Sequence, residues 1–281
     1  MGMRISSSAK LAALTAAFLA ALNGCSSASS PVRGNADPSF VSLNPCTDAI
    51  LVEVAEPTQI LALSHYSRDP ESSSIDPAIA AQYSVTSGTV EEVVALSPDV
   101  VLSSDFLAPA TRGVLADLGF RTETFGIASD PAQSFAQIRR LSALAGHTDR
   151  GEALIARIKT ALSENASPVN AEPISTVLWQ PGEIVPGDLT LASTLMRHAG
   201  LASHSAELGL GQADYLPLEQ VIANPPQLLL VAGNSPGQQH PALAQLGETR
   251  VEALDPSLLY CAGPTIIRAA ERLGNIRRSM L

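Results

Sequence analysis

The chain has 281 residues, of which 46% are hydrophobic and 16% charged, which is enough apolar material for a folded core and too little charge for a disordered chain. Its length fits one large domain or two modest ones. The formal net charge of −10 argues against a nucleic-acid partner, because phosphate binding needs clustered Lys and Arg side chains.

The first residues have the pattern of an export signal. Arg4 and Lys10 precede the apolar run 11–22, which has the length of a signal-peptide core and falls short of the ~20 residues that span a bilayer. We therefore predict a signal peptide over residues 1–25 and export of the mature chain to the periplasm. Residues 26–38 are mostly small and polar, and we expect them to form a flexible tether.

Two ways of processing fit the end of this signal. Residues 22–25, Leu-Asn-Gly-Cys, resemble a bacterial lipobox, in which Cys25 becomes the lipid-bearing first residue of the mature protein. The alternative is ordinary cleavage after Ala28, with Ser26 and Ala28 as the small residues. The first alternative predicts a lipid anchor to the membrane, and the second predicts no anchor.

Strands alternate with helices in the first half of the mature chain. We expect short strands over residues 40–43, 60–63, 83–85, 100–102 and 121–125. We expect helices over residues 49–54, 90–96, 109–118 and 134–145, and a long polar loop over residues 64–74. This alternation predicts a largely parallel, doubly wound α/β sheet.

One unit made of a helix, a proline break and a strand occurs twice. Residues 89–102 begin with Thr89, a good helix cap, and the helix must end before Pro98, after which an apolar run is typical of a buried strand. Residues 217–230 repeat this design at a constant offset, which places Glu219 in the position of Glu91. A repeat over so long a period indicates two similar α/β lobes and not a solenoid of short units.

A second helix follows the break at Gly146 and leads into the second half. Its cap is Thr148 or Asp149, and its apolar side runs to about Leu162. After a polar stretch over 165–173, we expect strands over 175–179, 228–231 and 251–254. Helices are expected over 190–199 and 242–246 and after Pro264.

Together these segments resemble the substrate-binding proteins of ABC importers that take up cobalamin, haem and iron-siderophore complexes. No single segment is specific, whereas their order and spacing are. The resemblance runs from about Phe40 to Leu273, and the segments that carry it are 41–48, 90–101, the helix pair around Gly146, 218–229 and 263–273.

The resemblance implies two doubly wound α/β lobes, joined by a single long backbone helix, with a ligand cleft between the lobes. The boundaries are then 39–147 for the N-terminal lobe, 148–165 for the linking helix and 166–281 for the C-terminal lobe. The implied function is capture of a metal chelate (a corrinoid, haem or an iron-siderophore complex) and its delivery to an inner-membrane ABC permease. We expect a monomer without catalytic activity.

The resemblance also implies one docking glutamate on each lobe, which pairs with arginines of the permease. Glu91 and Glu219 match those positions in the repeated unit. The alternative is that each is a charge in the first turn of a helix, where the macrodipole makes it favourable by a few tenths of a kcal/mol. The second reading needs no partner protein.

Ligands of open parallel sheets bind outside the carboxyl ends of the strands. On this rule the predicted ligand-binding residues are Cys46, His65, Tyr66, Arg68, Asp105, Phe106, Gln180, Tyr260 and Cys261. Trp179 and Tyr215 are two further aromatic residues that could stack on a planar ligand. Cations are sparse on these loops, so a strongly anionic catecholate siderophore would lack partners.

Cys46 and Cys261 fall on predicted ligand loops of different lobes. If Cys25 carries lipid, they remain as an even pair in an oxidising compartment. A disulfide is one alternative, and it requires Cα atoms within about 7 Å. The second alternative is a pair of thiolates that grip a soft metal with His65, and the third is two unpaired thiols.

No motif in the sequence indicates catalysis. There is no Walker phosphate loop and no Gly-x-Ser-x-Gly elbow, and Gly209-Leu-Gly211 lacks the third glycine of a dinucleotide fingerprint. The five histidines are scattered along the chain. The competing hypotheses are an exported metal-binding or trafficking protein that uses Cys46 and Cys261, and an exported hydrolase on a related fold.

Overall fold

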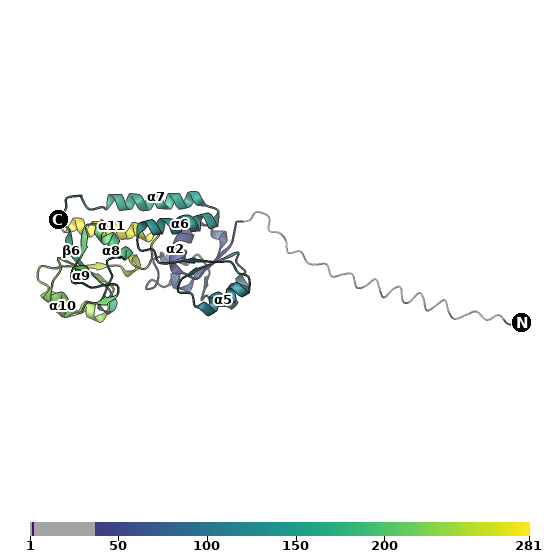
Figure 1. Ribbon diagram of the computed structural model, residues 1–281, viewed down its shortest axis with the longest axis horizontal. Coiled ribbons are helices and arrows are strands. Elements are labelled where there is room, and N and C mark those ends of the chain that lie inside the picture. Colours follow the sequence, from purple (N-terminus) through teal and green to yellow (C-terminus); the bar gives the residue numbers. More distant parts are fainter. Residues whose placement is uncertain (1, 3–36) are drawn as a thin grey trace. The chain divides into compact units, whose positions relative to one another are not determined.

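The computed structural model describes Gly2 and residues 37–281, and Asp37–Leu281 form one compact unit (Figure 1). The predicted signal peptide over 1–25, the lipidation of Cys25 and nearly all of the tether over 26–38 lie outside the described residues. Within the described part, none of the helices is both long enough and apolar enough to cross a membrane.

The strands that precede helix α7 (Thr148–Glu164) form one fully parallel sheet in the order β3-β2-β1-β4-β5. Its strands are β1 (Phe40–Ser42), β2 (Ile60–Ser64), β3 (Val85–Thr86), β4 (Val100–Ser104) and β5 (Thr122–Phe125). Its helices are α2 (Pro45–Val54), η1 (Pro57–Gln59), η2 (His65–Arg68), α3 (Pro77–Ala80), α4 (Val90–Leu96), α5 (Pro109–Asp117) and α6 (Pro131–Ala145). We call this sheet with its helices the N-terminal lobe.

The strands after α7 form a second parallel sheet in the order β11-β10-β6-β8, and β7 pairs antiparallel with β9. The strands are β6 (Ile174–Trp179), β7 (Ile184–Val185), β8 (Leu201–Ser203), β9 (Asp214–Tyr215), β10 (Leu228–Ala232) and β11 (Arg250–Leu254). The helices are η3 (Pro181–Glu183), α8 (Leu191–His198), α9 (His204–Glu207), α10 (Leu218–Ala223), η4 (Pro236–Gln239), η5 (Pro241–Gln245), η6 (Pro256–Leu258) and α11 (Thr265–Ser279). We call these elements the C-terminal lobe.

Local chemistry explains where the helices begin and end. The Asn44 side chain accepts a hydrogen bond from the Cys46 amide at the start of α2, and Thr89 caps α4 in the same way. Helix α4 ends at Ser97, which is left-handed at φ 48°, and Pro98 then prevents continuation. Helix α6 ends at Gly146 with φ 83°, a conformation that glycine adopts without strain.

The two sheets share one topology. In each, the first strand pairs with the strand that follows the repeated helix, namely β1 with β4 and β6 with β10. Strand β5 is the outer neighbour of β4, as β11 is of β10. Strand β2 is the other neighbour of β1, as β8 is of β6. The predicted repeat therefore corresponds to α4–β4 and α10–β10 in equivalent places of two similar sheets.

The edge strand β5 carries an ion-pair group. Arg121 pairs with Glu123 at 2.8 Å, and Arg140 of α6 pairs with the same carboxylate. Arg140 also donates a 2.8 Å hydrogen bond to the carbonyl of Thr124. A strand edge covered by charged side chains offers little to an adhering strand from another molecule.

The edge strand β11 repeats that group. Arg250 and Arg272 both pair with Glu252, at 2.7 and 3.1 Å, and Arg272 of α11 donates to the carbonyl of Ala253 at 2.7 Å. The resemblance between the lobes thus extends from their strand order to the side chains that protect one edge, a detail that the sequence analysis did not identify.

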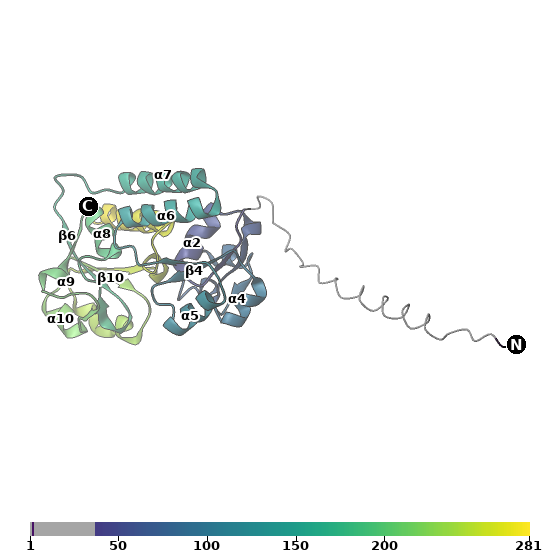
Figure 2. The same cartoon turned by 45° about the vertical axis from the view of Figure 1, so that its right-hand side comes forward.

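Helices α7 and α11 pack against each other and share a buried apolar cluster with both sheets. The cluster includes Leu51 of α2, Ile138 of α6, Ile155 of α7, Leu178 of β6 and Leu273 of α11. Burial of one such side chain stabilises the fold by about 1.5–3 kcal/mol. Figures 1 and 2 both show α7 along one side of the unit, with α10 and α5 on the opposite side.

The predicted fold class, α/β with parallel sheets in two similar lobes, is confirmed. The helix expected over 148–165 is present as α7, while the division into lobes at 147 and 166 stays a prediction. The antiparallel pair of β7 and β9, together with β8 and α9, is not predicted from the sequence. Short elements of two to four residues leave too little periodicity to be recognised.

Candidate functional site

The predicted ligand-binding residues all follow strands at the carboxyl ends of the two sheets. In the N-terminal lobe, Cys46 follows β1, His65–Arg68 form η2 directly after β2, and Asp105–Phe106 follow β4. In the C-terminal lobe, Gln180 follows β6, and Tyr260–Cys261 come after β11 and η6. The chain thus brings these residues to the edge of each sheet at which α/β proteins bind ligands.

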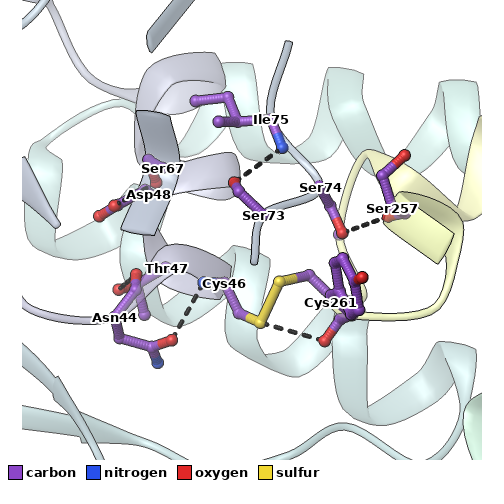
Figure 3. The surroundings of a disulfide bond; sticks show 12 residues. Asn44, Cys46, Thr47, Asp48, Ser67, Ser73, Ser74, Ile75, Ser257 and Cys261 are labelled. Atoms are coloured by element: carbon purple, nitrogen blue, oxygen red, sulfur yellow. Dashed lines mark hydrogen bonds between the residues drawn. A yellow bond between two sulfur atoms is a disulfide. The ribbon is translucent and has the colours of Figure 1, made fainter. Parts of the chain in front are cut away.

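Cys46 and Cys261 form a disulfide that joins the two lobes (Figure 3). Their Cα atoms are 5.1 Å apart, although 215 positions separate them in sequence. Of the three alternatives for these cysteines, the structure therefore has the disulfide. Disulfide sulfurs offer no thiolate to a soft metal. Among the described residues, no group of three or more His, Cys, Asp or Glu side chains is arranged to hold a metal ion.

Hydrogen bonds next to the disulfide join the same two parts of the chain. The Ser74 hydroxyl donates to the carbonyl of Ser257 at 2.6 Å (Figure 3). Arg268 donates to the carbonyl of Ser74. The Gly263 amide donates to the Ser134 hydroxyl at 2.9 Å. The predicted polar loop over 64–74 is therefore exposed only in part, because Ser74 is buried where the lobes meet.

A buried carboxylate, Asp48, holds the turn that follows β2. Its Oδ2 accepts hydrogen bonds from the Ser64 amide at 2.9 Å and from the Ser67 hydroxyl at 2.6 Å, while Oδ1 has no partner among the described residues. Burial raises the pKa of Asp48 to about 7, and the nearby Ser42 and Ser67 hydroxyls and the Ser64 amide only partly offset this. Sequence reasoning missed Asp48, because Asp in the first turn of a helix is ordinarily exposed.

The turn η2 presents His65 and Tyr66 side by side. Their ring centroids lie 4.0 Å apart, and His65 Nδ1 lies 3.3 Å from the carbonyl oxygen of Thr86. Tyr66 is 47% exposed, so about half of its surface is open to a ligand. Arg68 donates a 2.7 Å hydrogen bond to the carbonyl of Tyr83 and so extends along the edge of the sheet.

The loop after β4 carries the most exposed aromatic ring of the predicted set. Phe106 is 77% exposed, and its amide donates to the Ser104 hydroxyl at 3.3 Å. Asp105 is exposed as well, and its carbonyl, like that of Leu107, accepts a hydrogen bond from Arg112. An apolar ring held in water by a fixed loop is available to stack on a flat ligand.

The loops of the C-terminal lobe correct one expectation. Trp179 is fully buried, and its indole donates a 2.9 Å hydrogen bond to the carbonyl of Leu216, so it belongs to the core and does not stack on a ligand. Gln180, the next residue, is half-buried and pairs through its backbone with Ile184. Tyr260 is 41% exposed and adjoins the disulfide.

Glu91 and Glu219 are exposed in the first turns of α4 and α10. In the described part of the chain, neither carboxylate takes part in a hydrogen bond or an ion pair. Glu92 differs, because it accepts hydrogen bonds from the Thr86 hydroxyl at 2.6 Å and from Ser87, which lower its pKa. Of the two neighbouring glutamates on α4, only Glu91 is therefore available to a partner.

A small apolar cavity lies elsewhere, between the second sheet and helices α8 and α11. Leu178, Leu195, Met196, Leu254 and Leu273 are among its lining residues, and none of the predicted ligand-binding residues is. It belongs to the interior of the C-terminal lobe, and its lining residues are Leu, Ala and Met, so no polar side chain orients a ligand there.

Comparison with known proteins adds a family to this geometry. A family model described as Periplasmic binding protein matches residues 40–247. The chain belongs to the periplasmic binding protein family. Among curated proteins, no sequence matches that of this binding protein.

Solved structures resemble the binding protein over most of its length. The periplasmic vitamin B12 binding protein BtuF of Vibrio cholerae has 17% identity and a TM-score of 0.68, with 87% of this chain and 98% of that chain covered. The apo periplasmic heme-binding protein RhuT of Roseiflexus sp. RS-1 has 19% identity and a TM-score of 0.67, with coverage of 87% and 98%. A possible iron-binding periplasmic protein of Staphylococcus epidermidis has 14% identity and a TM-score of 0.66, with coverage of 86% and 98%.

The similarity to these structures establishes a shared fold. Together with the family match, it confirms the predicted resemblance to binding proteins of this class.

Proposed function

We propose that this binding protein captures a metal chelate outside the cytoplasm and delivers it to an inner-membrane ABC permease. The observation that carries the proposal is the family match over residues 40–247. The two similar sheets agree with it, because the predicted ligand-binding residues lie on loops at their carboxyl ends. Structures of similar fold are described as binding vitamin B12, haem or iron. The ligand class we propose is therefore a corrinoid, haem or an iron chelate.

The exposed rings of Tyr66, Phe106 and Tyr260 supply apolar surface for such a ligand. Macrocycles and metal chelates present broad faces, and aromatic side chains bury large area against them at little cost in conformational entropy. His65 is stacked against Tyr66 and orients it. Asp105, next to Phe106 in sequence, and Gln180, directly after β6, offer polar groups at the carboxyl ends of the two sheets, and we include them in the proposed ligand site.

The disulfide between Cys46 and Cys261 supports a site that is formed before the ligand arrives. It ties together the loops after β1 and β11, where a large hinge motion would otherwise separate the lobes. A preorganised site loses less entropy when it binds its ligand. We therefore place the disulfide at the base of the site and not among the groups that hold metal.

Glu91 and Glu219 are the residues we propose for docking to the permease. They occupy equivalent positions on α4 and α10, and both of these helices lie on the side of the unit away from α7 (Figure 2). Exposed carboxylates without competing internal partners suit ion pairs with arginines, which recognise carboxylates bidentately.

A charge reversal tests this function. We expect the double variant Glu91→Lys/Glu219→Lys to abolish uptake of the ligand by cells while ligand affinity of the purified protein stays within twofold of the original. The matched control is Glu164→Lys/Glu172→Lys, which changes two other exposed carboxylates and should leave uptake intact. Normal uptake by the double variant would reject the docking role.

We propose export to the periplasm, with a lipid anchor at Cys25. The lipobox-like residues 22–25 support the anchor. Replacement of Cys25 by Ser should move the protein from the membrane fraction to the soluble periplasmic fraction. An unchanged distribution would favour cleavage after Ala28.

A further inference from the structure

The basic side chains of residues 37–281 are concentrated away from the carboxyl ends of the two sheets. Most of the Arg residues, and Lys159, lie on α6, α7 and α11 or at the beginning of β5 and β11. The amino ends of the strands and the helices α6, α7 and α11 therefore carry most of the positive charge of this acidic protein.

Four arginines reach the loops at the carboxyl ends, and each is directed at the protein's own backbone. Arg68, Arg112, Arg197 and Arg268 all donate hydrogen bonds to backbone carbonyls, and Arg197 also pairs with a carboxylate. The acceptors are the carbonyls of Tyr83, of Asp105 and Leu107, of Asp188 and of Ser74. Each of these four guanidinium groups therefore spends part of its hydrogen-bonding capacity on the protein's own carbonyls and is held in place by them.

Carboxylates surround the place where the loops of the two lobes touch. Asp69 and Glu71 lie on the loop after η2, Asp255 lies on the loop after β11, and these two loops share a 2.6 Å hydrogen bond. Burial and then the negative charges of Glu71, Asp255 and Asp69 raise the pKa of the Tyr260 phenol. The surroundings of this exposed ring are therefore electrostatically negative.

Several loops that follow strands of the two lobes expose large apolar side chains. Tyr66, Phe106 and Ile127 project from the N-terminal lobe, and Leu189 and Tyr260 project from the C-terminal lobe. Apolar residues this exposed lose water-accessible area only when another molecule covers them. A ligand that fits both the apolar side chains and the negatively charged surroundings has an apolar face and no large negative charge.

We propose that the site selects chelates that are uncharged or cationic overall and present an apolar face, and that it repels polyanionic chelates. This inference rests on the proposed function, because it takes these loops as the ligand site. Polyanionic chelates bind through several cations that are free to turn toward them, and here each of the four guanidinium groups is held by hydrogen bonds to internal carbonyls. The carboxylates also repel a negatively charged ligand, and such repulsion is a common way for binding sites to reject a wrong partner.

Two pairs of probes, each with an uncharged and an anionic member, test the proposal. One pair is dicyanocobyrinic acid heptamethyl ester, which is uncharged, and dicyanocobyrinic acid, its polycarboxylate. The other pair is ferrichrome, an uncharged ferric complex, and ferric enterobactin, an anionic one. Isothermal titration of the disulfide-bonded protein should show that, in whichever pair binds, the uncharged member binds at least tenfold more tightly. Equal or tighter binding of the anionic member overturns the proposal.

A triple variant tests the repulsive element directly. Asp69→Asn/Glu71→Gln/Asp255→Asn should strengthen binding of the anionic member about tenfold, because exposed charges each change an equilibrium about twofold, and leave the uncharged member unchanged. Asp117→Asn/Glu164→Gln/Glu172→Gln removes the same net charge at other exposed positions and should alter neither. Equal effects of the two variants would show that net charge, not the local carboxylates, governs selection, and would overturn the proposal.

Failure of the proposed function gives a different result. If none of the four probes binds, and haemin and cyanocobalamin do not bind either, the protein is not a receptor for this class of chelate. If an anionic probe binds tightly, the protein remains such a receptor and only the charge selection is wrong.

Discussion

Removal of the disulfide between Cys46 and Cys261 has the largest expected effect on stability. The chain-entropy relation for a loop closed by residues 215 positions apart gives about 5 kcal/mol, at the upper end of the measured range. For a folded unit of this size, each kcal/mol lowers Tm by about 2–4 °C. We therefore expect Cys46→Ala/Cys261→Ala to melt at least about 10 °C below the original protein.

The assay is thermal unfolding followed by far-UV circular dichroism, with and without reductant. Reductant should lower Tm of the original protein to that of the double variant and should not affect the variant itself. Hydrogen exchange should speed up at residues 44–48 and 257–263, because these segments meet at the disulfide. The reasoning is refuted if the variant melts within about 3 °C of the original protein with unchanged exchange in both segments.

Three further changes test the packing around the site. Asp48 holds its proton more tightly in the folded protein, because its pKa is raised from 3.8 to about 7. Its contribution to the free energy of unfolding is therefore full below about pH 4. This contribution falls by about 1.4 kcal/mol per pH unit up to about pH 7. Asp48→Asn should thus match the original protein in urea unfolding at pH 4 and exceed it by up to about 4 kcal/mol at pH 8; parallel pH curves would contradict this. Trp179→Phe leaves the buried carbonyl of Leu216 without its donor and should cost about 1–3 kcal/mol in the same measurement, whereas no loss would place Trp179 outside the core. Ser74→Ala removes the hydrogen bond to Ser257 and should cost about 1 kcal/mol, and a neutral result would mean that this bond adds nothing to the junction.

Local sequence signals predict much of the fold. Thr89 and Pro98 act within their own helix and turn, so the unit α4–β4 can be predicted from the sequence, and α10–β10 follows by repetition. Gly146 likewise marks the boundary between α6 and α7 because only a residue tolerant of positive φ ends a helix in this way. The α/β alternation predicts parallel, doubly wound sheets, but it does not predict the order of the strands within each sheet.

The missed features depend on residues far apart in sequence. Trp179 looks like a ligand contact because it is the last residue of a strand, at the carboxyl end of the sheet, and only the carbonyl of Leu216 and the surrounding apolar cluster show that it belongs to the core. From the sequence, Asp48 looks like an exposed carboxylate in the first turn of a helix. In the structure, the turn after β2 donates hydrogen bonds to it from Ser64 and Ser67. The choice among the alternatives for Cys46 and Cys261 likewise depends on a distance between two lobes that no local pattern encodes.

The central claim is that this protein carries a metal chelate and does not transform it. Native mass spectrometry and a visible absorption spectrum of the gently purified, disulfide-bonded protein test that claim most directly. We predict an added mass equal to one metal chelate, with its absorption band, which is released unchanged when the protein is denatured. The account is contradicted if the folded protein carries no such ligand and also fails to bind cyanocobalamin, haemin and ferrichrome when they are supplied.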